Sequence, residues 1–186
     1  MIVAASLVLI GTTTEAQSLM VVNSPRPFSV VAPATWVQQP TTTGNSRVKF
    51  SSPSGTPRAE CAVIVIDSPA LRGFSQEYFN AIALDLPAAS DLAYQLTSRY
   101  NNVGVWGVGF ATISGFPAQS YNVRYSVGSP IGEIWGTSRH VTAMTAPGFA
   151  WVVSCGGLGK TPQEADIAFS HWQIEILRFS TNVRIL

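Results

Sequence analysis

Charged residues are scarce in this chain. They make up 11% of its 186 residues, whereas about a quarter is usual in soluble domains. The formal net charge is +1, and the two lysines and nine arginines are spread along the sequence. Because nucleic acids and anionic lipids are bound through clustered positive charge, we expect neither as a partner. Hydrophobic residues reach 46%, which argues against a disordered chain and favours one domain with one core.

Residue types that carry catalysis or bind metals are also few. The chain has two histidines, His140 and His171, and neither has a second histidine or an acidic residue at metal-ligand spacing. The carboxylates are scattered and show no obvious acid/base pair in the sequence. We therefore expect no metal and no cofactor, and an enzymatic activity is the less favoured interpretation.

The apolar run at residues 2–10 is too short to cross a bilayer, so we expect no transmembrane span in the mature chain. It has the form of a signal-peptide core, and Thr14 and Ala16 place small residues three and one before a cut after Ala16. The basic residues that usually precede such a core are missing. We predict a signal peptide-like segment over residues 1–16 and an extracytoplasmic protein, periplasmic or secreted. A buried first strand is the alternative.

Only two cysteines occur, Cys61 and Cys155. In an exported chain an even number of cysteines favours pairing. Both lie in apolar, strand-like runs, where buried free thiols are also common. A disulfide and two buried thiols therefore both remain open, because spacing alone does not show whether the two Cα atoms are within reach.

Alternating and continuous apolar runs predict a sheet with few helices. Residues 19–27 read as an irregular, proline-rich lead-in, and the single domain spans residues 19–186. The links between strands are short, which favours antiparallel pairing. The predicted class is α+β, with a largely antiparallel sheet of about six or seven strands packed by two main helices. Strands are expected near 28–32, 47–51, 59–67, 103–113, 120–127, 133–145 and 149–153, and helices at 75–86 and 161–179, with a further helix possible at 88–99.

The final stretch predicts a strand, a glycine turn and one capped helix. Thr161 and Glu164 have the spacing of a capping box, with Pro162 at the first helical position. Apolar residues then recur at steps of three and four and form one face that must pack on the sheet. These residues are Ala165, Ala168, Phe169, Trp172, Ile176 and Phe179.

The glycines of this stretch also resemble a phosphate-binding loop. The segment from Ser154 to Thr161 reads SCGGLGKT and lies between a strand and a helix, and the apolar run ending at Asp67 resembles a strand that presents a magnesium ligand. Ser154 stands where the motif needs glycine or alanine, and the neighbouring strands are expected to be antiparallel. A nucleotide-dependent or hydrolytic enzyme that uses this loop is therefore the alternative function.

Five tryptophans favour aromatic packing, with one or two left for a surface site. Trp135 lies near Arg139 in the sequence, and Tyr125 belongs to the preceding predicted strand. We predict a binding patch formed by Trp135, Arg139 and Tyr125.

Several short motifs resemble the PsbP-like fold family. They are FSVVAPATW at residues 28–36, with its Pro-x-x-Trp turn, ISGFPA at 113–118, and the closing strand with the helix sequence FSHWQIEILRFS at 169–180. The resemblance covers roughly residues 28–181. It implies an αβα sandwich and a non-enzymatic scaffold or binding role outside the cytoplasm, and it carries over no catalytic residue. The favoured hypothesis is an exported, non-enzymatic binding or assembly module for another envelope protein or a small ligand.

Overall fold

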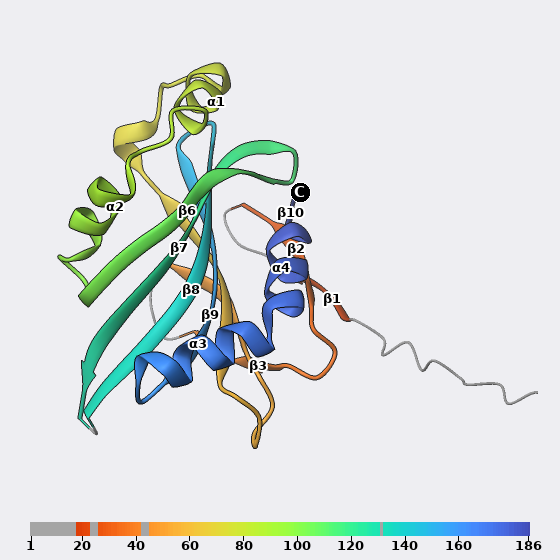
Figure 1. Cartoon of the computed structure of the whole chain (residues 1–186). Coiled ribbons are helices and arrows are strands. Elements are labelled where there is room, and N and C mark those ends of the chain that lie inside the picture. Colours follow the sequence, from red (N-terminus) through yellow and green to blue (C-terminus); the bar gives the residue numbers. More distant parts are fainter. Residues whose placement is uncertain (1–17, 23–25, 42–44, 131) are drawn as a thin grey trace, which may run out of the picture.

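A seven-stranded antiparallel sheet forms the centre of the computed structural model, which describes residues 18–22, 26–41, 45–130 and 132–186 (Figure 1). The signal-like segment at residues 1–16 lies outside these residues. The strand order is β3-β4-β5-β9-β8-β7-β6. The strands are β3 (Val37–Gln39), β4 (Ser46–Ser51), β5 (Ala59–Asp67), β6 (Asn101–Ile113), β7 (Phe116–Ser129), β8 (Gly132–Thr145) and β9 (Phe149–Gly159). The predicted α+β class with a largely antiparallel sheet is confirmed.

A second, small sheet joins the two ends of the described chain. It contains β1 (Ser18–Val22), β2 (Phe28–Ala32) and β10 (Arg184–Ile185), in the order β1-β2-β10. The prediction that residues 19–27 are irregular is therefore wrong for 19–22, which pair with β2. Leu19 and Val21 are exposed while Met20 and Val22 pack against the core, which is the two-residue period of a half-buried strand.

Four α-helices occupy the places where the sequence predicts two main helices and a possible third. They are α1 (Gln76–Ala83), α2 (Ala89–Leu96), α3 (Pro162–His171) and α4 (Gln173–Thr181), and a short 3-10 helix, η1 (Pro69–Leu71), precedes α1. The single helix predicted over 161–179 is wrong, because the chain breaks at Trp172 (φ −99°, ψ 13°). The Trp172 Nε1 atom donates a hydrogen bond to the Pro57 carbonyl (2.7 Å), a distant contact that holds the break in place.

The helices cover both faces of the sheet. Thr137 on β8 donates to the Asp166 carboxylate of α3 (2.6 Å). Gln119 on β7 donates to the Ile82 carbonyl of α1 (3.0 Å). Thr137 is the register partner of Arg124 on β7, so the side chains of these two residues share one face of the sheet. Gln119 is an odd number of residues from Arg124 on the same strand, and successive side chains of a strand point to opposite faces. The contacts with α3 and α1 therefore lie on opposite faces. The result is a helix–sheet–helix sandwich, with α2 beside β6.

The main core lies between the sheet and the pair formed by α3 and α4. Trp151 of β9 is fully buried and meets Phe28 of the small sheet edge-on, with ring centroids 5.8 Å apart. Phe50 of β4 meets Phe179 of α4 in the same way, also at 5.8 Å. Because aromatic side chains bury large apolar areas, these contacts hold the small sheet and α4 on the main sheet.

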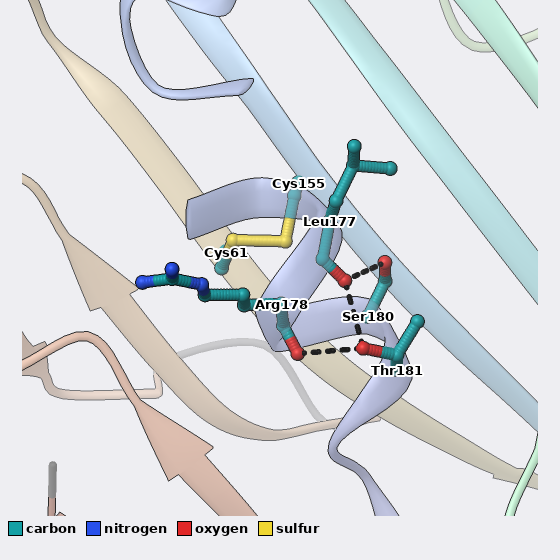
Figure 2. Close-up of a disulfide and its surroundings, with 6 residues drawn as sticks. All are labelled: Cys61, Cys155, Leu177, Arg178, Ser180 and Thr181. Carbon is teal, nitrogen blue, oxygen red and sulfur yellow. Dashed lines mark hydrogen bonds between the residues drawn. A yellow bond between two sulfur atoms is a disulfide. The ribbon is translucent and has the colours of Figure 1, made fainter. Parts of the chain in front are cut away.

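Cys61 and Cys155 lie directly opposite each other on β5 and β9, with their Cα atoms 4.0 Å apart. Their sulfur atoms are joined in a disulfide beside α4, as Figure 2 shows. At the end of α4, the Ser180 and Thr181 hydroxyls donate to the Leu177 carbonyl at 2.9 and 3.1 Å. The bridge therefore links β5 to the central strand of the sheet, β9, beside the C-terminal helix.

The predicted glycine turn is wrong, because β9 continues through the glycines to Gly159. Gly156 pairs with Glu60 on β5 and with Ser138 on β8. A Cβ atom at Gly157 would lie 2.2 Å from the backbone nitrogen of Phe169 in α3. Gly157 and Gly159 thus allow the α3 backbone to lie directly on the strand, and they do not form a loop.

The predicted cap of the last helical region is confirmed at α3. Thr161 is the N-cap residue, and its hydroxyl accepts a hydrogen bond from the Glu164 backbone nitrogen (3.2 Å). The Glu164 carboxylate reaches back to the backbone nitrogen of Lys160 (2.7 Å), one residue before the cap. These two bonds fix the connection between β9 and α3.

Candidate ligand-binding groove

An open, largely apolar groove of about 450 Å³ lies where β9 passes into α3. Its volume falls in the range of about 300 to 1,000 Å³ that is typical of small-molecule sites. Charged residues stand beside the apolar ones, two of them basic and one acidic. The groove is lined by Pro57, Arg58, Ile134, Leu158, Gly159, Lys160, Glu164, Ile167 and Ala168.

The walls of the groove are held by contacts that do not depend on a ligand. Leu158 donates its backbone N–H to the Arg58 carbonyl (2.8 Å), which ties β9 to the segment before β5. Pro57 is fixed by the indole of Trp172, and Glu164 by the cap of α3. A pre-formed site of this kind loses little entropy on binding.

Ile167 is the most exposed apolar side chain of the lining. It is 64% exposed, although it belongs to a helix whose other face is packed against the sheet. Ala165 and Ala168 form that packed face and are 0% and 1% exposed. Ile167 therefore offers apolar surface that the folded domain itself does not cover.

The positive charges around the groove differ in how they are paired. Arg58 bonds to one oxygen of Glu60 (2.9 Å), and Lys49 bonds to the other (2.7 Å). Burial raises the pKa of Glu60, but the hydrogen bonds from Lys49 and Arg58 outweigh it, so the pKa lies below its ordinary value. Within the described part of the chain, the Lys160 ammonium group has no ion pair.

The residues of the predicted patch lie on two faces of the sheet. Trp135 is paired with Gly159 and Arg139 with Cys155, which puts both side chains on the face that α3 and α4 cover. Tyr125 is paired with Gly136 and so points to the other face, where its ring lies 4.4 Å from that of Tyr100. Burial there raises the pKa of Tyr125 to about 12. A binding role for Trp135, Arg139 and Tyr125 stays a prediction, although the three side chains do not share one face.

A serine–histidine contact on β8 is a second arrangement that the sequence did not reveal. The Ser138 hydroxyl lies 3.1 Å from His140 Nε2, and the His140 ring stacks on Tyr121 at 5.2 Å. Burial lowers the pKa of His140 to about 4, so the imidazole is neutral near pH 7. Ser138 is only 3% exposed, which keeps its hydroxyl away from a substrate. The contact thus has a packing role in this structure.

Two further properties of the described residues bear on the site. No group of three or more His, Cys, Asp or Glu side chains there is placed to hold a metal ion. Across the same residues, no helix has both the length and the apolar character needed to cross a membrane.

Solved structures with the same fold were found, although no protein-family model and no curated protein matches the chain. One is the solution structure of cyanobacterial PsbP (CyanoP) from Synechocystis sp. PCC 6803, with a TM-score of 0.57 and 11% identity over 98% of both chains. Another is LpqN, involved in cell envelope biogenesis of Mycobacterium tuberculosis, with a TM-score of 0.51 and 11% identity over 90% of both chains. The chain therefore has the PsbP-like fold, and the resemblance stated from its motifs is confirmed at that level.

Proposed function

We propose that this protein of PsbP-like fold is an exported, non-enzymatic binding module, and that the groove beside α3 is its binding site. The observation that carries the proposal is the open apolar groove with the uncovered side chain of Ile167 in its lining. Small-molecule sites are typically concave and mostly apolar, with a few polar groups that orient the ligand. Arg58, Lys160 and Glu164 are such groups.

Export is supported by three separate features. Residues 1–16 have the pattern of a signal peptide. The bonded pair Cys61–Cys155 suits an oxidising compartment, since disulfides are rare in the reducing cytosol. LpqN, which has the same fold, is described as involved in cell envelope biogenesis, and that description supports the proposal by fold likeness alone.

The alternative function, a nucleotide-dependent or hydrolytic enzyme, has less support because the glycine segment that it would use belongs to strand β9. The backbone of residues 154–159 pairs with β5 and β8, so it cannot surround a phosphate. Asp67 lies at the far end of β5 from these glycines, roughly 25 Å away at about 3.3 Å a residue. Its carboxylate is bonded instead to Arg72 (2.7 Å). Asp67 is therefore not placed to supply a magnesium ligand to the glycine segment.

The test compares two isoleucines of similar exposure on the C-terminal helices. Ile167, which lines the groove, is 64% exposed, and Ile174, which does not, is 61% exposed. We expect Ile167→Asp to weaken binding of the neutral dye Nile red at least tenfold, because it puts a charge into an apolar site. Ile174→Asp should bind the dye like the unaltered protein. Equal affinities of all three proteins, each shown folded by circular dichroism, would contradict a site in the groove.

A further inference from the structure

We infer that the groove takes a single-chain amphiphile with an anionic head group, of the fatty-acid type, with its head at Lys160 and its chain along Leu158 and Ile167. This inference names the ligand class of the proposed site and so rests on the proposed function. It depends on the division of the groove into an apolar part and a positively charged rim.

The apolar part fits a hydrocarbon chain. Its apolar lining residues are Pro57, Ile134, Leu158, Ile167 and Ala168, of which Ile167 is the most exposed, and its charged lining residues are Arg58, Lys160 and Glu164. Polar groups of a ligand that were buried among the apolar residues would lose their hydrogen bonds to water without replacement. A sugar or a nucleoside therefore fits poorly, whereas an alkyl chain gains from every methylene that leaves water.

The rim fits an anionic head group. Two cations against one carboxylate leave it net positive. Arg58 is already bonded to Glu60, whereas the exposed Lys160 side chain has no ion pair within the described residues. Glu164 is occupied as well, because its carboxylate accepts the hydrogen bond from the Lys160 backbone. The Lys160 ammonium is thus the charge that remains available to a ligand.

The position of Lys160 adds to this preference. It directly precedes Thr161, the N-cap of α3, and the N-terminal end of a helix carries a partial positive charge. The chain has only two lysines, and the other, Lys49, is held by Glu60 at 2.7 Å. A cationic head group would meet repulsion at this rim, and a neutral one would gain nothing from Lys160.

The experiment measures the binding of sodium octanoate, sodium decanoate and the neutral analogue 1-decanol by calorimetry, at concentrations below micelle formation. The full mature protein with its disulfide intact is used. We expect decanoate to bind about fifteenfold more tightly than octanoate, because each added methylene contributes about fourfold. Lys160→Gln should weaken decanoate binding roughly threefold to tenfold and leave 1-decanol unchanged. Arg178→Gln, which removes an exposed cation of α4 outside the groove, is the matched control.

The outcomes separate this inference from the proposed function. Equal binding of decanoate and 1-decanol, with no effect of Lys160→Gln, would overturn the anionic ligand class while the groove itself remained a site. If Ile167→Asp weakened the binding of none of these ligands, Nile red included, the proposed function would be overturned. Sedimentation with phosphatidylglycerol vesicles in the absence of decanoate binding would also overturn the inference, because the groove would then dock on a membrane surface.

Discussion

Gly157 of β9 and Phe169 of α3 are in direct backbone contact: a Cβ atom at position 157 would lie 2.2 Å from the Phe169 nitrogen. The same atom would lie 2.5 Å from the Ala165 carbonyl oxygen. Real Cβ atoms do not approach other atoms so closely, so α3 can rest here only on a glycine. Ile167 of this helix and Leu158 of this strand both line the groove.

Gly157→Ala should therefore destabilise the protein. The added methyl group must push α3 away from β9, and such overpacking costs about 1 to 3 kcal/mol, here at the upper end. Chemical denaturation measures the change. Gly104→Ala is the control, because nothing lies within 4 Å of a Cβ built at Gly104 in β6. Its effect should stay within about 0.5 kcal/mol. Equal stabilities of the two variants would contradict the backbone contact.

Cys61 and Cys155 should be oxidised in the native protein. Mass spectrometry after alkylation should find no modified cysteine without reductant and two with it. Replacing both with alanine should lower the free energy of unfolding by about 2 to 5 kcal/mol, because the bridge closes a long loop, with 94 residues of sequence separation. Two alkylatable thiols in the native exported protein would show that the bridge is absent.

His140 should make the protein less stable as the pH falls. Burial lowers its pKa to about 4 from the ordinary 6.5, so the unfolded chain takes up a proton before the folded one does. Stability should be constant above pH 6.5 and decrease between pH 6.5 and 4, by about 3 kcal/mol in total. His140→Phe keeps the ring on Tyr121 and should flatten this part of the profile. An unchanged slope in the variant would contradict a neutral, partly buried imidazole.

Glu60 should affect the stability of the protein in a lower pH range than His140 does. Its pKa is lowered in the folded state, so its contribution to stability is complete above the ordinary value of 4.5 and is lost as the pH falls below it. Glu60→Gln should therefore remove part of the acid sensitivity below pH 4.5 and leave the slope above pH 5 as it is. Denaturation curves at closely spaced pH values measure this. If the variant retained the full acid slope, the ion pairs with Lys49 and Arg58 would not form in solution.

The fold was largely predictable because its strands follow simple patterns. The alternation of Val63 and Val65 with Ile64, and the short links between strands, indicated an antiparallel sheet. The break at Trp172 was not predictable, because Trp172 continues the apolar face of the helix and the carbonyl that its indole bonds to, that of Pro57, lies 115 residues away in the sequence. Nor could the sequence distinguish a glycine turn from a strand that a helix must approach, since glycines at positions 156, 157 and 159 suit both.

The candidate site was much less predictable than the fold. The patch of Trp135, Arg139 and Tyr125 relied on closeness in sequence, whereas strand register turned Tyr125 to the other face. The groove brings together residues near positions 57, 134 and 158–168, and only three-dimensional packing places these segments side by side. One signal was available: Ile167 is an apolar residue that lies off the apolar face of its helix.

The most direct test of a binding site in the groove is nuclear magnetic resonance with the isotope-labelled, disulfide-bonded protein and sodium decanoate. We predict that the amide signals of Leu158, Gly159, Lys160, Ile167 and Ala168 shift most on titration, and that Ile167→Asp abolishes these shifts. Saturable shifts centred on Trp135 and Arg139, or no saturable shifts at all, would contradict the groove as the binding site.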